Sequence, residues 1–215
     1  MSWSARVGDV GMRIGIVGAG HIGGTAAKLF AKAGHLVAVS NSRGPATLAS
    51  LVSSIGPNAK ASSVVEAVQF GEAVLLALPY RKIDSLPPAE SFAGKIVIDA
   101  MNPYSAVGRV MDLGESTSSE EVAKRMPGAH LVKAFNTMGW NTLASGSRPA
   151  HEERLVVFIA GEDAAAKATV AKLIDEIGFA SLDTGSLREG GRRQQPGTRI
   201  YGRPMTVREA KQILR

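Results

Sequence analysis

The chain has 215 residues, of which 45% are apolar and 5% aromatic, and it contains no cysteine. This length is enough for one well-filled core, and the lack of cysteine excludes disulfides, iron–sulfur clusters, thiolate zinc sites and thiol nucleophiles. The formal net charge of +6 is concentrated near the end, where residues 188–215 hold eight Lys or Arg against two Glu. The positive charge is confined to this tail and forms no basic stripe across the fold, which argues against a nucleic-acid-binding protein. A site for small anions or plain solubility explains the excess charge equally well.

The chain opens with Met1–Gly11, which has no apolar stretch of the kind found in signal peptides. We expect these residues to form a disordered tail. The alternative is that translation starts at Met12 and that these residues result from the choice of Met1 as the start. The apolar runs further on have the length of strands rather than of membrane spans. The sequence therefore predicts a cytoplasmic protein with no membrane segment.

From Met12 to Asp183, apolar strand-like runs alternate with helix-length segments. The expected strands are Arg13–Val17, Leu36–Ser40, a short piece near Lys60, Ala73–Ala77, Ile96–Asp99, Leu131–Phe135, Leu155–Ala160 and Ala180–Asp183. The expected helices are Gly24–Ala33, Pro45–Ile55, Ser63–Phe70, Glu120–Met126 and Ala164–Ile177. Short strands that are apolar on both faces and alternate with helices predict an α/β fold with a mostly parallel sheet, covered by helices on both sides.

Residues 184–215 differ in character from the preceding part, being glycine-rich, basic and without clear periodicity. We expect an ordered surface segment, closed by a short helix from Thr206 to Leu214. Its proposed roles are contact with the second substrate or with another subunit.

A glycine fingerprint, G-x-G-x-x-G, follows the first strand and opens the first helix: Gly18, Ala19, Gly20, His21, Ile22 and Gly23. In this context the first glycine permits a tight turn, the second lets the backbone approach a pyrophosphate, and the third lets helix and strand pack closely. Free N–H groups at the helix N-terminus then bind the phosphates. The motif predicts a Rossmann-type doubly wound domain that binds a dinucleotide over residues 12–183.

The end of the second strand indicates which dinucleotide is bound. NAD-binding sites place an acidic residue there for the ribose 2′-hydroxyl, but this chain continues from Ser40 with Asn41, Ser42 and Arg43. A hydroxyl and a guanidinium suit a 2′-phosphate, which a carboxylate would repel. The sequence predicts NADP(H), with Ser42 and Arg43 at the 2′-phosphate.

Three further loops, at residues 78–80, 101–104 and 135–138, lie at the edge where ligands bind in such sheets. We expect Asn102, Asn136 and Thr137 to surround the nicotinamide. Asparagine is also a common turn residue, so each position on its own has a purely structural alternative.

No catalytic acid, base or nucleophile stands out. His21 and His35 have no Ser, Asp or Glu at a diagnostic spacing, so no triad is expected. His130 is isolated, and His151 lacks a second histidine at a metal-binding spacing. We expect no metal site.

Four segments together resemble the NADP oxidoreductases that use coenzyme F420: residues 12–44, LALPY at 76–80, VIDAMNP at 97–103 and LVKAFNT at 131–137. They are also similar to the NADPH-binding domain of the STEAP metalloreductases. The resemblance covers residues 12–183 and implies hydride transfer between NADP(H) and F420 or a flavin such as FMN or FAD. It places Gly18, Gly20, His21 and Ile22 at the pyrophosphate, Ser42 and Arg43 at the 2′-phosphate, and Leu78, Pro79, Asn102 and Asn136 at the nicotinamide. A homodimer is expected.

The chain departs from the family after Asp183, where a shorter basic segment replaces the helices that help shape the deazaflavin pocket. The resemblance therefore does not determine the identity of the hydride acceptor. An imine or pyrroline reductase would need a long helical C-terminal domain, which the residues after Asp183 cannot supply. A non-enzymatic NADP(H) redox sensor or partner subunit is the other alternative.

Overall fold

The computed structural model describes residues 11–215. The expected disordered tail, Met1–Gly11, lies outside the described residues except for Gly11. An eight-stranded sheet crosses this part of the chain in the order β3-β2-β1-β4-β5-β6-β7-β8. The strands are β1 (Arg13–Val17), β2 (Leu36–Ser40), β3 (Ala59–Ser62), β4 (Ala73–Leu76), β5 (Ile96–Asp99), β6 (His130–Ala134), β7 (Val156–Gly161) and β8 (Ala180–Asp183). The predicted fold is confirmed: the first six strands have the Rossmann order and are parallel.

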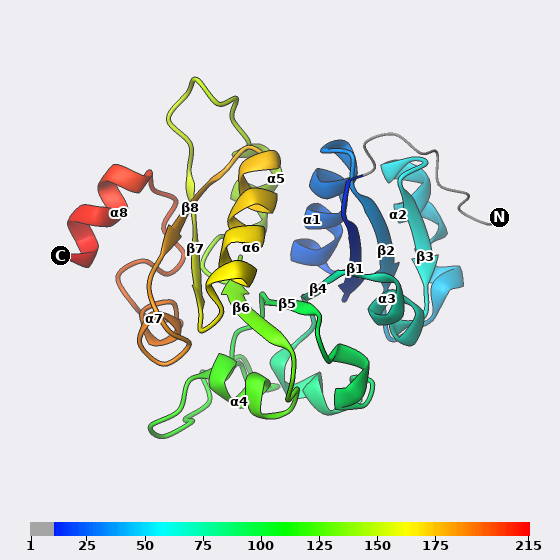
Figure 1. Cartoon of the computed structure of the whole chain (residues 1–215), viewed down its shortest axis with the longest axis horizontal. Helices are drawn as coiled ribbons and strands as arrows, with labels where there is room; N and C mark the ends of the chain where they lie inside the picture. Colours follow the sequence, from blue (N-terminus) through cyan, green and yellow to red (C-terminus); the bar gives the residue numbers. More distant parts are fainter. Residues whose placement is uncertain (1–10) are drawn as a thin grey trace.

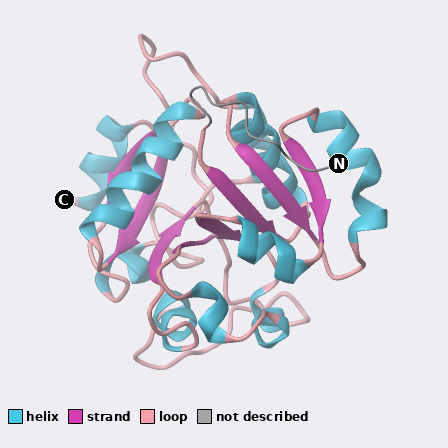
Figure 2. Cartoon of the chain, turned by 45° about the vertical axis from the view of Figure 1, so that its right-hand side comes forward, coloured by secondary structure: helices cyan, strands magenta, loops and turns pink. Residues whose placement is uncertain are grey.

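Helices cover both faces of this sheet (Figures 1 and 2). They are α1 (His21–Lys32), α2 (Ala49–Ile55), α3 (Val64–Phe70), α4 (Ser118–Lys124), α5 (Trp140–Ser145), α6 (Ala164–Glu176), α7 (Glu189–Arg193) and α8 (Val207–Leu214). Alternate strand residues face opposite sides, so Ala73 and Leu75 join the core with α1 and α6, whereas Val74 and Leu76 join the core with α3 and α4. The double covering explains why the strands read as continuous apolar runs.

The last two strands reverse the direction of the sheet. β7 runs antiparallel to β6, with Ala134 level with Ile159, and β8 runs parallel to β7, with Asp183 level with Ile159. The end of β8 therefore lies level with the end of β6. As a result the C-terminal segment, residues 184–215, starts beside the loop that follows β6.

Several element boundaries differ from the expectation for local reasons. α1 begins at His21, not Gly24, because Gly20 already serves as its N-cap. The first turn after Pro45 is a 3₁₀ turn, so α2 itself starts at Ala49. α4 begins at Ser118, two residues before the expected Glu120, because Thr117 and Glu120 form a capping box.

β6 ends at Ala134 instead of Phe135. Phe135 has a φ of 66°, the single positive value at a non-glycine residue within 11–215. This left-handed conformation breaks the strand, while the Phe135 ring stays fully buried at right angles to Phe30. The turn delivers Asn136 to the edge of the sheet.

The C-terminal segment is more than a surface extension. It contains α7, which the sequence did not predict, and its residues Leu187, Gln194, Ile200 and Met205 are buried. Thr206 caps α8 through a second Thr/Glu capping box. Packing against the sheet thus orders a stretch whose own pattern is irregular. Within residues 11–215 no helix has both the length and the apolar character that crossing a bilayer requires.

Candidate functional site

The fingerprint loop joins β1 to α1 at the carboxyl edge of the sheet. A Cβ on Gly18 would lie 2.4 Å from the Ala77 carbonyl oxygen, and Gly18 has a φ of +105°. A Cβ on Gly23 would lie 1.8 Å from the Gly18 carbonyl oxygen. Both glycines are therefore required by packing within the protein itself.

Gly20 differs from these two glycines. A Cβ there would meet no protein atom within 4 Å, so the fold leaves open space in front of it. No side chain caps the N-terminus of α1, and its first turn contains no acidic residue. Free N–H groups and the positive end of the helix dipole thus face this space, which suits a pyrophosphate. Ala19 and Ile22 are half-buried and pack against the core below the loop.

The loop after β2 is built on Asn41. Its side-chain oxygen accepts a hydrogen bond from the Arg43 N–H at 2.9 Å, and its amide nitrogen donates to Thr47 Oγ1 at 2.9 Å. Ser42 and Arg43 are exposed. The preceding residue, Ser40, is fully buried and donates to the Ile16 carbonyl, which anchors the loop to β1. A hydroxyl and a guanidinium are therefore presented to solvent at the end of β2, as a 2′-phosphate requires.

A cleft of about 370 Å³ lies beside the fingerprint loop, at the point where the strand order reverses between β1 and β4. Its walls come from the fingerprint, the β4 loop and the β5 loop: Gly20, His21, Ile22, Ala77, Leu78, Pro79, Tyr80, Arg81, Ala100, Met101, Asn102 and Tyr104. The structure thus brings Leu78, Pro79 and Asn102 to the same cavity as His21 and Ile22. Cofactors bind at this position in doubly wound sheets.

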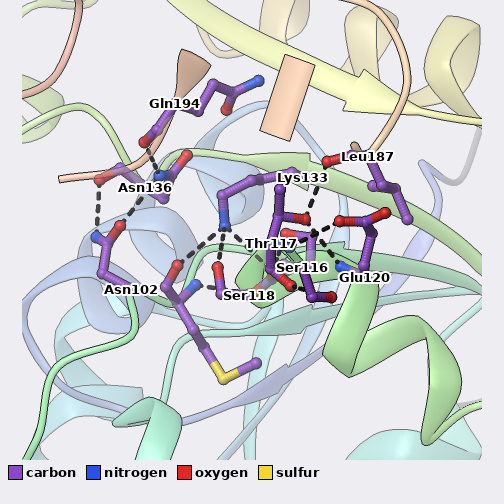
Figure 3. Close-up of polar contacts among 12 residues, drawn as sticks. Asn102, Ser116, Thr117, Ser118, Glu120, Lys133, Asn136, Leu187 and Gln194 are labelled. Carbon is purple, nitrogen blue, oxygen red and sulfur yellow. Dashed lines mark hydrogen bonds and ion pairs between the residues drawn. The ribbon is translucent and has the colours of Figure 1, made fainter. Parts of the chain in front are cut away.

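Asn136 is tied to this cleft through Asn102. The Asn102 amide donates to the Asn136 backbone carbonyl at 2.9 Å, and the Asn136 amide donates to Asn102 Oδ1 at 3.1 Å (Figure 3). The Asn136 amide also donates to the backbone carbonyl of Gln194 at 2.7 Å. Asn136 Oδ1 is buried without a hydrogen-bond partner in the described chain. Asn136 is not among the residues that line the cleft and reaches it only through Asn102, so its contact with the nicotinamide stays a prediction.

Thr137 is buried and does not line the cleft; its backbone carbonyl accepts from the Gly202 N–H at 2.8 Å. Its role is thus to hold the C-terminal segment. Tyr201, the neighbour of Gly202, places its hydroxyl 3.1 Å from that of Tyr104. Burial, together with the Tyr104 hydroxyl, raises the pKa of Tyr201 well above its ordinary value. Tyr201 therefore stays protonated at neutral pH, and its hydroxyl links the C-terminal segment to Tyr104, which lines the cleft.

An aromatic stack at the cleft was not predicted from the sequence. The rings of His21 and Trp140 are 4.5 Å apart and inclined by only 15°. Trp140 begins α5 and is 42% exposed, which is unusual for so large an apolar side chain. The available signal was a tryptophan that follows the predicted strand Leu131–Phe135 within five residues.

A buried charged pair lies beneath the β5 loop and was missed too. Lys133 in β6 and Asp99 in β5 are both fully buried, with Nζ 3.2 Å from Oδ2. Two charged residues inside otherwise apolar neighbouring strands were a readable signal, because such residues are rarely buried unless paired. Likewise His35, for which no partner was expected, is buried beside Glu176, with Nε2 3.1 Å from Oε2.

Comparison with known proteins relates this chain to NADP oxidoreductases. Residues 13–103 match the model of the family described as NADP oxidoreductase, coenzyme F420-dependent. A hypothetical protein of Sinorhizobium meliloti is 35% identical, with a TM-score of 0.80 and coverage of 91% of this chain and 95% of that one. The chain therefore contains a domain of the coenzyme F420-dependent NADP oxidoreductase family. This domain and the similar structures support an NADP-dependent oxidoreductase.

Two further proteins place the family in context. An Arthrobacter protein proposed to be an F420-dependent NADP-reductase is 29% identical, with a TM-score of 0.73 over 84% of this chain and 89% of that one. The rat metalloreductase STEAP3 is 32% identical over 186 residues, which is 85% of this chain. The chain spans only 36% of the length of STEAP3. The resemblance stated from sequence is thus confirmed for both groups.

Proposed function

We propose that this protein transfers a hydride between NADP(H) and a deazaflavin such as coenzyme F420, or a flavin such as FMN or FAD. The observation that carries the proposal is the position of the His21–Trp140 stack. His21 lines the cleft together with the other fingerprint residues and Asn102, and we place the nicotinamide in this cleft. A flat ring system can stack on exposed aromatic side chains, and deazaflavins and flavins are both flat and tricyclic.

The chemistry of such a transfer comes from the two cofactors, which supply the carbon atoms that give and receive the hydride. The protein needs to bind and orient them and to exclude water. Pro79 and Tyr80 from the β4 loop, with Tyr104 from the β5 loop, supply nonpolar surface around the cleft. The lack of an obvious acid, base or nucleophile is therefore compatible with the proposed reaction.

The test is to mix purified protein with NADPH and oxidised F420, with FMN and FAD in parallel, and to follow the absorbance of both reactants. We expect turnover with at least one of the three acceptors. Silence in every reaction, with NADPH still bound, would contradict the proposal and favour a non-enzymatic redox sensor.

Trp140 gives the proposal a second, sharper test. Trp140→Ala should raise the KM for the acceptor about fivefold, because stacking on one aromatic ring contributes about 1 kcal/mol, while NADPH affinity stays unchanged. Trp140→Phe retains a stacking surface and should recover most of the loss. An acceptor KM that does not respond to either substitution would show that the acceptor binds elsewhere.

A further inference from the structure

The buried Lys133–Asp99 pair is organised around one residue of the cleft wall, Met101. Asp99 Oδ1 accepts a hydrogen bond from the Met101 N–H at 2.9 Å, and Lys133 Nζ donates to the Met101 carbonyl at 3.2 Å (Figure 3). The two opposite charges therefore hold the donor and the acceptor of the same residue. Met101 lines the cleft and immediately precedes Asn102.

The remaining contacts of Lys133 and Asp99 give both charged groups further hydrogen-bond partners. The Lys133 ammonium has three acceptors, namely Asp99 Oδ2 at 3.2 Å, the Met101 carbonyl, and Ser118 Oγ at 3.4 Å. Asp99 Oδ2 also accepts from Ser119 Oγ at 2.5 Å. The cluster thereby ties β5, β6 and the first turn of α4 to the β5 loop.

Stability alone does not account for this arrangement. Removing two charges from water is costly, and a buried ion pair is often no more stabilising than apolar side chains of the same volume. Apolar residues fill the neighbouring positions Ile98, Val132 and Ala134. Apolar residues cannot, however, fix the orientation of the two peptide groups that flank the Met101 side chain.

That orientation reaches the cofactor side of the cleft through Asn102. Asn102 lines the cleft, and its side chain exchanges hydrogen bonds with Asn136, which lies behind it. We propose that Lys133 is a positioning residue, whose ammonium fixes the Met101–Asn102 loop and thereby the nicotinamide half of bound NADP(H). This inference deepens the proposed function, since it requires the nicotinamide to lie in this cleft.

Two binding probes test the inference directly. NADP⁺ carries a nicotinamide, whereas 2′-phospho-ADP-ribose has the same adenosine, phosphates and second ribose without it. In Lys133→Met, which keeps the length of the side chain, we expect NADP⁺ to bind about tenfold more weakly, the equivalent of one or two lost hydrogen bonds. Binding of 2′-phospho-ADP-ribose should change less than about twofold, because its contacts lie at the fingerprint and the β2 loop.

Lys167→Met is the matched control. Lys167 also pairs with an aspartate, Asp183, at 2.7 Å, but on α6 and away from the cleft. It should leave the affinities for both probes unchanged. Equal weakening of the two probes in Lys133→Met, or no weakening of either, would overturn the inference.

Lys133→Met leaves Asp99 buried without its counter-charge and can fail to fold. The double variant Lys133→Met/Asp99→Asn removes both charges while keeping an acceptor for the Met101 N–H. We expect it to regain thermal stability but not the affinity for NADP⁺, because the Met101 carbonyl still lacks its donor. A double variant that binds NADP⁺ like the unmodified protein would overturn the inference.

The same measurements separate this inference from the proposed function. Turnover in the unmodified protein decides whether a deazaflavin or flavin is the acceptor, whereas the ratio of the two affinities decides the role of Lys133. If turnover is found, Lys133→Met should lower kcat by about 100-fold, as expected for a misplaced reactant, with little change in the acceptor KM. A normal kcat would contradict the inference even if the acceptor is correct.

Discussion

The two halves of the sheet hold their binding groups by different means. In the half formed by β1–β4, the groups that face the cofactor are backbone N–H groups and short exposed loops, and the buried polar side chains are His35, Ser40 and Ser62. In the half formed by β5–β8 and the C-terminal segment, a buried network of side chains does this work: Asp99, Thr117, Ser118, Ser119, Lys133, Asn136, Thr137, Thr184 and Gln194. The first half is built by local backbone geometry and the second by contacts between distant segments. We call them the nucleotide half and the acceptor half after the roles proposed for them.

The largest expected effect tests whether the nucleotide half depends on backbone geometry. Gly20→Val should abolish binding of both NADPH and NADH, a loss of more than about 100-fold, because the side chain fills the space in front of α1. The free energy of unfolding should fall by no more than about 1 kcal/mol, since the new Cβ meets no protein atom. Calorimetric titration and denaturant unfolding measure the two quantities.

Gly23→Ala is the matched control at the other end of the same motif. Its Cβ would collide with the Gly18 carbonyl, so the protein should lose about 3 kcal/mol or more of stability. If Gly20→Val proved as destabilising as Gly23→Ala, Gly20 would be a structural residue like its neighbours. Retained cofactor binding in Gly20→Val would remove the fingerprint from the site.

An intermediate effect is expected at the β2 loop. Arg43→Ala should weaken NADPH binding about 10- to 100-fold, the contribution of one charged hydrogen bond, and leave NADH within about twofold. Arg109→Ala removes the same charge from the acceptor half and should alter neither affinity. Equal loss of NADPH and NADH in Arg43→Ala would mean that Arg43 does not recognise the 2′-phosphate.

The smallest effect concerns a contact that joins the two halves. Burial lowers the pKa of His35 below its ordinary value of 6.5, and the nearby carboxylate of Glu176 offsets this only in part. The neutral imidazole is thus favoured in the folded protein. Below pH 6.5 the unfolded chain takes up a proton that the folded protein resists, so stability should fall as the pH drops from that value.

Denaturant unfolding at a series of pH values measures this slope. His35→Phe should flatten it, whereas His151→Gln, at a side chain that is 81% exposed, should not. An unchanged slope in His35→Phe would assign the acid sensitivity to other groups.

The contrast between the halves also explains what the sequence alone could predict. The fingerprint, the β2 loop and the order of the elements are local patterns, and the glycine spacing carries its own geometric reason. Leu78, Pro79 and Asn102 were placed at the cleft because parallel strands end at a common edge. The Tyr104–Tyr201 pair joins residues 97 positions apart, and no local pattern indicates that contact.

Some of the missed features did have a signal. Thr117 followed three residues later by Glu120 is a capping box that marks the true start of α4. Lys133 and Asp99 interrupt apolar strands, which predicts a buried pair once the strands are known to be neighbours. Phe135 gives no such signal, since nothing in its residue type favours a positive φ. The acceptor half was less predictable because its geometry exists only after the sheet has formed.

The reversal at β7 has a consequence for the evolution of this protein. Because Asp183 lies level with Ala134, the C-terminal segment begins at the acceptor side of the cleft without crossing the nucleotide half. It packs on the end of a sheet whose other strands are already paired. Exchanging this one terminal stretch would therefore replace the groups that contact Asn136 and Tyr104 and leave the fingerprint and the β2 loop unaltered, so the two parts of the chain are free to evolve separately.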